Sequence, residues 1–396
     1  MNKKITIVLA VLMVSTLAVF AGGNQEVATA DGSPLGDVPA GIKLSADGRY
    51  PEKTVKLGFV NYDSTAQQVL EIKTYFAYLQ QAFNFEIIWS ESLSSAEEEF
   101  AFIESCAAAG CKGIIGYYNE GHAESVKLAS SLGMYYWGGA EIPSIYDAAK
   151  DDPMYVGGYD TGSKDYDFGV AIVEALVKAG SHKIIVMSGG KNYGVPFFVS
   201  RYNGIMDGIK AAKDEGYDIE VVYEVPGWPG TEEFAAHQAA ALDTDADGLA
   251  GTLTTLMWIQ PLQNAGKFGK IKMSSIESVN DDMVDLMLAG AYVGICAEIS
   301  DMFGMSIPMI INAVEGYGDM QRNADGTAGK IKAASWKISD VEELKYFASI
   351  EKKGGTWVFD IDDVKTVLGA FNPNLSVDSM GELYSAVSAD EIKARR

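Results

Sequence analysis

The hydrophobic positions of the chain follow two patterns that alternate along its length. Short apolar runs such as 55–60 and 183–187 have the length and composition of buried strands. Between such runs, apolar residues recur at helical spacing, as they do in 65–83 and 201–214. The alternation of strand and helix predicts an α/β fold in which parallel sheets carry helices on both faces.

The alternating pattern falls into two successive series, and the second begins after Asp160. Each series has enough strands for one doubly wound parallel sheet, so we expect two similar lobes joined by a multi-stranded hinge. Open sheets of this kind bind small molecules outside the carboxyl ends of their strands, which places a ligand cleft between the lobes. The expected first lobe comprises 51–159 plus 299–325, and the expected second lobe comprises 160–298 plus 326–396.

The N-terminus has the features of a secretory signal peptide. Two lysines precede an apolar run at 5–20, and small residues follow it. The run is short for a membrane span, so cleavage after export is favoured over a retained anchor. We expect a signal peptide at 1–21, a flexible tether rich in Gly, Ala, Asp and Pro at 22–50, and a periplasmic mature protein. No cysteine near the cleavage site offers a point for lipid attachment.

The balance of charged residues excludes one class of partner. The chain has 54 Asp plus Glu against 31 Lys plus Arg, which gives a formal net charge of −23. Because so acidic a chain offers no large basic face to phosphate backbones, we do not expect nucleic-acid binding.

Cysteine and histidine are too few to build a disulfide scaffold or a metal site. Cys106, Cys111 and Cys296 form an odd set, and the sequence leaves open whether Cys106 and Cys111 are bonded or free. The three histidines stand far apart and lack metal-ligand spacing, so we expect no zinc.

Two loops contain part of a known ligand motif. The segment 243–254 opens like a calcium loop, with Asp at alternate positions, but Thr254 stands where the bidentate Glu belongs. The segment 188–191 lacks the spacing of a phosphate-binding loop, and no Gly-x-Ser-x-Gly elbow supports a catalytic triad. We therefore expect no metal, no cofactor and no catalytic residue.

Polar and aromatic residues gather directly after the predicted strands. Carboxylates, amides and an arginine can hold neighbouring hydroxyls, and flat rings can cover a sugar or a base. The alternative for each residue is that it caps the following helix or, for the arginine, lies on a helix surface. The candidate ligand-binding residues of this kind are Tyr62, Asp63, Tyr117, Asn119, Trp137, Glu141, Arg201, Thr252, Thr254, Glu277 and Asn280.

Several motifs resemble those of the type I periplasmic binding proteins, the sugar-binding components of ABC transporters. The resemblance extends over about 55–315 and is carried by Val156–Asp160 and by Ser188-Gly189-Gly190 followed by Arg201–Ile209. It implies that Arg201, at the start of a helix, binds sugar hydroxyls. The segment 297–304 is similar to the family's crossing back into the first lobe, which adds Glu298 to the candidate residues.

The chain departs from the family pattern at several candidate positions. The family often has Asn-Asp where this chain has Thr252-Leu253-Thr254, and usually Asp where it has Glu277. Where an Asp or Arg commonly follows a first-lobe strand, the chain has 117–119 and 138–141. The segment beyond Gly329 is longer than the family needs, and we interpret it as an elaboration of the second lobe.

The leading hypothesis is a periplasmic solute-binding protein of an ABC importer. It is expected to be a monomer without enzymatic activity that closes on a small sugar or polyhydroxylated ligand and delivers it to the permease. One alternative is a nucleoside receptor of the same fold, in which Tyr62, Tyr117 or Trp137 stacks on the base. Another is a sensor that docks on a histidine kinase. An exported glycosidase, with two carboxylates at one bond, is the alternative from a different class.

Overall fold

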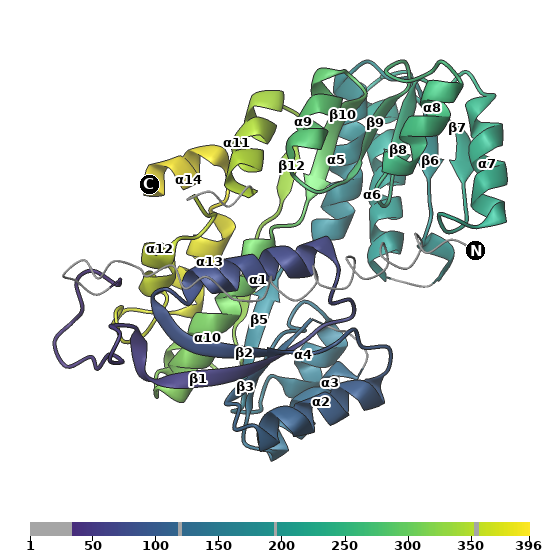
Figure 1. The fold of residues 1–396 in the computed structure, drawn as a ribbon. Coiled ribbons are helices and arrows are strands. Elements are labelled where there is room, and N and C mark those ends of the chain that lie inside the picture. The colour runs from purple at the N-terminus through teal and green to yellow at the C-terminus, as the bar shows by residue number, and fades with distance from the viewer. Residues whose placement is uncertain (1–33, 118–120, 194–195, 352–355) are drawn as a thin grey trace, which may run out of the picture.

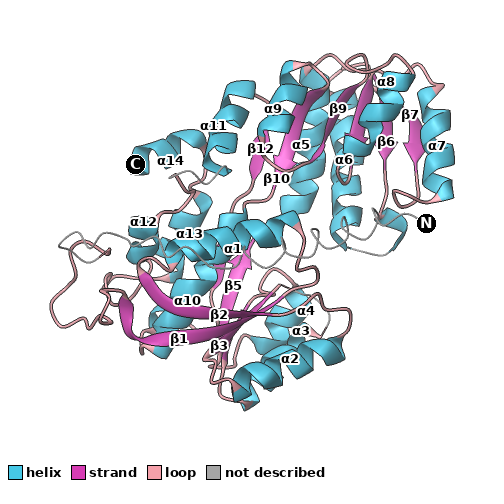
Figure 2. Cartoon of the chain, in the orientation of Figure 1, coloured by secondary structure: helices cyan, strands magenta, loops and turns pink. Residues whose placement is uncertain are grey.

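The computed structural model describes residues 34–117, 121–193, 196–351 and 356–396, which form two lobes with one six-stranded sheet each (Figure 1). Helices lie on both faces of each sheet (Figure 2). The first sheet consists of β1 (Tyr50–Val60), β2 (Phe83–Trp89), β3 (Gly113–Gly116), β4 (Tyr135–Trp137), β5 (Tyr155–Asp160) and β11 (Lys330–Lys332). The second consists of β6 (Lys183–Met187), β7 (Glu220–Val225), β8 (Gly248–Gly251), β9 (Lys272–Ile276), β10 (Tyr292–Ala297) and β12 (Trp336–Ile338).

The helices follow the strands in sequence order. The first lobe contains α1 (Gln67–Leu79), α2 (Ala96–Ala108), α3 (His122–Ser131), α4 (Pro143–Ala149) and α10 (Ser306–Val314). The second contains α5 (Lys164–Lys178), α6 (Pro196–Asp214), α7 (Glu232–Leu242), α8 (Ile259–Asn264) and α9 (Asp281–Leu288). The C-terminal segment adds α11 (Val341–Glu351), α12 (Ile361–Thr366), α13 (Val377–Ser385) and α14 (Ala389–Arg395). Short 3-10 turns are η1 (Lys191–Tyr193), η2 (Leu256–Trp258), η3 (Ser300–Met305) and η4 (Gly318–Gln321).

The strand order confirms the predicted doubly wound α/β architecture. It is β11-β5-β4-β3-β1-β2 in the first sheet and β12-β10-β9-β8-β6-β7 in the second. The pairs between these strands are parallel except β10 with β12. The carboxyl ends of the strands of each sheet therefore lie along one edge, where the loops that carry the candidate residues begin.

Successive residues of one strand enter different hydrophobic cores. Ile114 of β3 packs in the cluster of Ile103, which belongs to α2. Its neighbour Ile115 lies in the cluster of Ile72, which belongs to α1. Side chains alternate between the two faces of a strand, so an unbroken apolar strand requires helices on both faces. The apolar runs of the sequence predicted this burial correctly.

The described part of the expected tether, 34–50, packs against the core. Leu35 is buried, and its carbonyl accepts a hydrogen bond of 2.8 Å from Lys365 Nζ. Val38, Ile42 and Leu44 are partly buried against the same core. The scattered apolar residues of 34–50 thus pack against the core of the first lobe. The expected signal peptide lies outside the described residues. In the described part of the chain, no helix has the length and apolarity of a membrane span.

Cys106, Cys111 and Cys296 are all free and buried. The structure therefore places free thiols at Cys106 and Cys111, whose pairing the sequence left open.

The C-terminal segment joins both lobes and does not belong to the second lobe alone. Lys330–Lys332 pairs with β5 in the first sheet, whereas Trp336–Ile338 pairs with β10 in the second. The assignment of all of 326–396 to the second lobe is therefore corrected for β11. The chain crosses between the lobes a further time between Lys332 and Trp336, because each short strand completes the edge of a different sheet.

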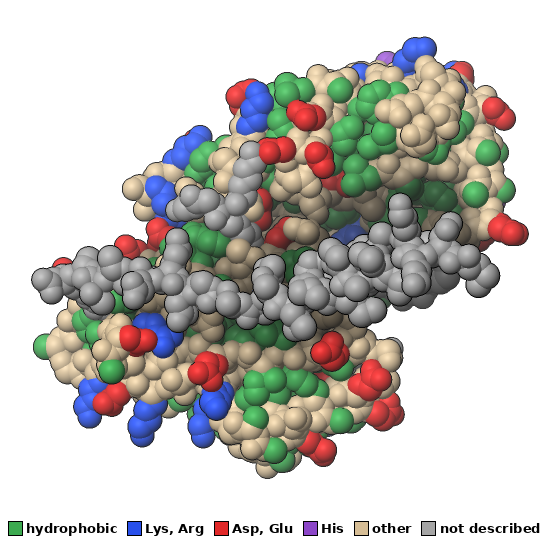
Figure 3. All heavy atoms as spheres, viewed as in Figure 1, with side chains coloured by type: hydrophobic (Ala, Val, Ile, Leu, Met, Phe, Trp, Pro, Cys, Tyr) green, Lys and Arg blue, Asp and Glu red, His purple; other side chains and the backbone are tan. Residues whose placement is uncertain are grey.

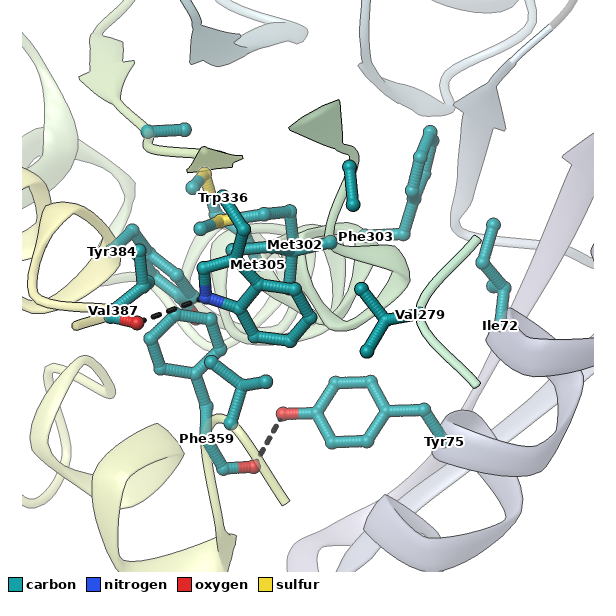
Figure 4. Close-up of a cluster of buried hydrophobic side chains, with 14 of the residues drawn as sticks. Ile72, Tyr75, Val279, Met302, Phe303, Met305, Trp336, Phe359, Tyr384 and Val387 are labelled. Atoms are coloured by element: carbon teal, nitrogen blue, oxygen red, sulfur yellow. Dashed lines mark hydrogen bonds between the residues drawn. The ribbon is translucent and has the colours of Figure 1, made fainter. Parts of the chain in front are cut away.

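The part of the C-terminal segment beyond this crossing also contacts both lobes. On the first-lobe side, Tyr75 donates a 2.7 Å hydrogen bond to the carbonyl of Phe359. On the second-lobe side, the indole of Trp336 stacks on Phe347 of α11 at 4.2 Å. Figure 4 shows Val279, from the loop after β9, beside Trp336 and Tyr75 in one hydrophobic cluster. The C-terminal segment thus buries apolar surface of both lobes next to the hinge.

Two of the crossing segments approach too closely for any side chain. Gly157 of β5 has φ +86°, and a Cβ there would lie 2.0 Å from the carbonyl oxygen of Gly329. The neighbouring Gly158 amide donates to the same oxygen at 3.4 Å. Only glycine satisfies both the positive φ and this backbone contact.

We expect Gly157→Ala to lower the free energy of unfolding by about 3 kcal/mol, because it adds a backbone clash to left-handed strain. Urea denaturation followed by circular dichroism measures this loss. The matched control is Gly162→Ala, where φ is +56° and no atom lies within 4 Å of the added Cβ. It should cost only about 1 kcal/mol. Equal losses in the two variants would contradict the close-contact interpretation.

Candidate functional site

Glu298 is the point at which the two lobes and the hinge share polar contacts. It follows β10 directly, and its carboxylate accepts a 2.8 Å hydrogen bond from Lys164 Nζ of the second lobe. Gln68 of α1, in the first lobe, donates to the same carboxylate at 3.2 Å. Arg201 Nη2 lies 3.6 Å from Glu298 Oε1. These residues form what we call the interlobe network.

The sequence predicted Arg201 at the start of a helix, but the residue lies inside α6. The helix begins at Pro196, so Arg201 falls in its second turn. Arg201 is only 7% exposed, and its guanidinium donates to Asp165 Oδ1 through Nε at 2.8 Å and to the Thr252 carbonyl through Nη1 at 3.3 Å. Its Nη2 is also 2.8 Å from Asp165 Oδ1. A guanidinium has five N–H donors, so this anchoring fixes its orientation and leaves donors for a ligand.

The interlobe network sets the charge of Glu298. The Lys164 ammonium, supported by its hydrogen bond and by Arg201, lowers the pKa of Glu298 to about 2 against the opposing effect of desolvation. The side chain is still 37% exposed, so the carboxylate is ionised and accessible to solvent at neutral pH. It is therefore available as an acceptor for ligand hydroxyls.

Glu141 lies near the same charges but has the opposite shift. Burial raises the pKa of Glu141, and the nearby carboxylates of Asp160 and Glu298 raise it further, while Lys164 opposes them. This sequence-predicted residue therefore joins the interlobe network electrostatically.

Aromatic rings border the network on the first-lobe side. The exposed ring of Tyr62 lies 5.3 Å from that of Tyr117, whose hydroxyl donates to Gln68. Burial raises the pKa of Tyr117, so its hydroxyl is retained as a donor. Trp137 is different: it is buried and donates from Nε1 to the Met309 sulfur at 3.3 Å. Two of the three predicted aromatic residues therefore lie at the site, and Trp137 supports the rings from the core.

The second lobe supplies exposed aromatic residues that the sequence did not single out. Phe197 lies under the guanidinium of Arg201, with 4.9 Å between the Arg201 Cζ atom and the ring centroid. Trp228 is 43% exposed and packs edge-on against Phe198 at 5.6 Å. Trp228 lies in the loop after β7, so it follows a strand as the predicted residues do, whereas Phe197 lies in the first turn of α6.

Three predicted residues of the second lobe are engaged in its own structure. Glu277 is buried and accepts from the Thr254 hydroxyl at 2.8 Å and from Tyr292 at 2.9 Å. The Ser275 hydroxyl and the amide of residue 255 donate to it as well, which uses the roughly four acceptor positions of a carboxylate. Thr252 donates to the carbonyl of Gly189 at 2.9 Å. These contacts hold the loops after β6, β8 and β9 together.

Two further candidates have local roles, and a third is not described. Asn280 caps α9 by accepting from the Met283 amide at 2.9 Å. Asp63 accepts from the amide and hydroxyl of Thr65, as in an Asx turn. Asn280 thus makes the helix-capping contact that was the alternative to ligand binding, whereas Asp63 makes a turn contact. Asn119 lies outside the described residues.

The sequence pattern did not single out Gln68 and Lys164, which bind Glu298, or Asp165, which binds Arg201. Gln68 is a helical residue of α1, and Lys164 and Asp165 form the first turn of α5. None of them directly follows a strand end, so the rule used for the prediction passed over them. Lys164 and Asp165 do follow the crossing at Asp160, which is a signal that sequence reasoning could have used. In the described ranges, no group of three or more His, Cys, Asp or Glu side chains is placed to hold a metal ion.

The fold is that of known periplasmic sugar-binding proteins. No protein-family model and no curated protein matches the chain. An ABC transporter periplasmic solute-binding protein from Actinobacillus succinogenes 130z, with bound D-allose, is similar at a TM-score of 0.58 and 13% identity, over 74% of this chain and 99% of that chain. A solute-binding protein from Bacillus halodurans C-125, with bound myo-inositol, gives 0.54 and 16%, over 75% and 97%. A periplasmic sugar-binding protein from Pseudomonas fluorescens gives 0.59 and 9%, over 82% and 99%. The fold implied by the resemblance to type I periplasmic binding proteins is confirmed.

The low pKa of Glu298 predicts an acid-dependent stability. A carboxyl group whose pKa is depressed on folding stabilises the protein above its unfolded value, near 4.3, and loses that contribution as the pH falls toward 2. We therefore expect wild-type protein to be more stable than Glu298→Gln at pH 6, with the difference shrinking between pH 4.5 and 2. Denaturation midpoints at several pH values measure it.

The control for this series is Glu342→Gln, which removes an exposed partner of Lys345. Solvent screens such a pair, so its difference from wild type should stay small throughout. A constant difference between wild type and Glu298→Gln down to pH 2 would contradict the electrostatic role of Glu298.

Proposed function

We propose that the protein is a solute-binding protein of an ABC importer that binds a small sugar or other polyhydroxylated ligand between its lobes. The observation that carries the proposal is the interlobe network around Glu298, which draws on both lobes of a periplasmic sugar-binding fold. The ligand is delivered to a permease after the lobes close, and no covalent step is involved. Export to the periplasm, which the signal-peptide pattern predicts, is part of the same proposal.

The charge of the network favours a neutral ligand with several hydroxyls. Lys164 and Arg201 balance Asp165 and Glu298, so the four groups carry no net charge at neutral pH. Carboxylate and guanidinium groups accept from and donate to adjacent hydroxyls, which matches the alternating donors and acceptors of a sugar. The rings of Tyr62 and Trp228 are exposed on opposite lobes and can cover the apolar faces of the same ligand.

A nucleoside would use the same rings for base stacking and the same network for its ribose. We prefer the sugar because it carries hydroxyls on every side, and the charged groups near the rings can bind several hydroxyls. A ligand screen that includes nucleosides separates the two.

A glycosidase is the second candidate, and one observation favours it. Glu141 has a raised pKa and Glu298 a lowered one, which is the division expected of an acid and an ionised carboxylate. Incubation with a panel of nitrophenyl glycosides at high protein concentration tests it. If the wild-type protein releases product and Glu141→Gln does not, the glycosidase assignment replaces the binding proposal. If no product is released, the glycosidase is excluded.

Binding should be detected as a thermal shift with a specific sugar or polyol. A ligand at a hundredfold its dissociation constant adds about 2.7 kcal/mol of apparent stability. Small-angle scattering on the same sample should give a smaller radius of gyration at unchanged mass, since the lobes close. Failure of every monosaccharide, oligosaccharide and polyol while a nucleoside binds would shift the assignment to the nucleoside receptor. A tight ligand that leaves the scattering curve unchanged would contradict the closing mechanism.

Trp228→Ala should weaken binding of the ligand found in that screen by about 1–2 kcal/mol, since it removes an exposed ring without opening the core. Isothermal titration calorimetry gives the affinity. The matched control is Leu288→Ala, which truncates an exposed side chain of α9 that ends at the opposite edge of the sheet. Equal affinity in wild type and Trp228→Ala would exclude the ring from the ligand site.

A further inference from the structure

Two of the three free thiols lie together in the first lobe. Cys106 belongs to the last turn of α2, and Cys111 lies just before β3. Both side chains pack in the hydrophobic cluster that contains Ile114. The face of the first lobe in Figure 3 carries charged side chains of both signs, whereas these two thiols are buried.

The backbone at the end of α2 brings the two cysteines together. Gly110 has φ +80°, and its amide donates to the carbonyl of Ala107 at 3.0 Å. The Cys111 amide donates to the Cys106 carbonyl, also at 3.0 Å. Two such bonds around a left-handed glycine define a Schellman motif. Cys106 and Cys111 occupy the two positions of this motif whose side chains frequently meet.

The two thiols contact each other inside this motif. The Cys106 thiol donates to the Cys111 sulfur, and this contact together with burial raises the pKa of Cys106. The same contact lowers the pKa of Cys111 against the opposing effect of desolvation, and the positive charge of Lys56 lowers it further. Cys106 Sγ also lies against Gly58 of β1, 2.6 Å from the place where a Cβ would be. The strand therefore has a glycine where the sulfur needs room.

Cys296 provides the internal reference for this pair. It is buried in β10 of the second lobe, and its Sγ donates to the carbonyl of Phe168 at 3.7 Å. Burial raises the pKa of Cys296 to about 12. The other two cysteines of the chain lie in the first lobe, so we expect Cys296 to behave as an isolated, unreactive thiol.

We propose that Cys106 and Cys111 are a redox pair that forms an intramolecular disulfide with a disulfide oxidant, R–S–S–R. The Cys111 thiolate attacks one sulfur of the oxidant and releases R–S⁻. The Cys106 thiolate then attacks the Cys111 sulfur of the mixed disulfide and releases the second R–S⁻. The protons of the two cysteines end on these leaving groups, so the chain loses two electrons and the oxidant is reduced to two R–SH.

Cys111 is the member of the pair that an oxidant reaches first. Its neighbours Gly110 and Lys112 are exposed, and Cys111 itself retains 4% exposure against 1% for Cys106. Helix ends open locally at a low cost in free energy, which gives an oxidant access to the end of α2. The bond ties this helix end to the segment that enters β3. It persists in an oxidising compartment such as the proposed periplasm, although its formation can be tested without that part of the proposed function.

Counting thiols by mass spectrometry tests the proposal. The protein is incubated with oxidised glutathione in its native state and, in a second arm, is refolded from urea in a glutathione redox buffer. After an acid quench, denaturation and alkylation with iodoacetamide, we expect all three cysteines to be alkylated without oxidant and Cys296 alone after oxidation. Before alkylation, the oxidised chain should be lighter by two hydrogens, and its circular dichroism should match that of the reduced protein.

Cys296→Ala is the first control, and oxidation should leave no thiol to alkylate in this variant. Cys111→Ala removes one member of the pair, so Cys106 should remain alkylated in the native arm. A bond that forms only in the refolding arm supports the proposal and shows that oxidation precedes burial. Three alkylated cysteines in both arms, a glutathione adduct that persists in place of the bond, or an oxidised product without native circular dichroism would each overturn the proposal.

Discussion

The ionised carboxylate of Glu298 is the interaction on which the functional arrangement depends. A carboxylate at the junction of two lobes is stable only where cations and donors reach it from several elements. Lys164 and Arg201 come from the second lobe and Gln68 from the first. The contacts that keep Glu298 ionised therefore depend on the relative position of the two lobes. Any change in the angle between the lobes alters at least one of these contacts.

Two glutamates that follow neighbouring strands show how surroundings decide a role. Glu298 faces cations, and its pKa is lowered to about 2. Glu277 faces neutral hydroxyls and an amide, and burial raises its pKa. The first remains charged and partly exposed, whereas the second is enclosed by its donors and organises the second lobe. The same residue type at an equivalent place in the topology therefore stays accessible at the junction of the lobes in one case and holds the loops of one lobe together in the other.

The C-terminal segment combines with this network to shape the hinge. The ring of Tyr75 lies 5.3 Å from that of Trp357, and β12 pairs with β10, so the segment is attached to both lobes. The close passage of Gly157 by Gly329 fixes the backbone between them. Polar contacts on one side can break and re-form with a ligand, but the buried apolar surface beside the hinge resists separation. The same segment also lines a cavity between the crossings 160–167 and 330–337.

The features that the sequence predicted, the buried strands and the two lobes, depend on local periodicity. The apolar runs around Ile114 predicted a strand buried on both faces, and the alternation of elements predicted two lobes, because burial of short apolar strands requires helices at fixed spacing. The sequence made Arg201 a candidate at the start of a predicted helix, and the family resemblance added Glu298; Arg201 Nη2 and Glu298 Oε1 lie 3.6 Å apart in the interlobe network. Which polar groups meet depends on the tertiary structure. Lys164 and Gln68 are distant in sequence but both bind Glu298, and the Asn280 side chain caps its own helix. Such pairings follow from the angle between the lobes, and no local pattern of residues encodes that angle.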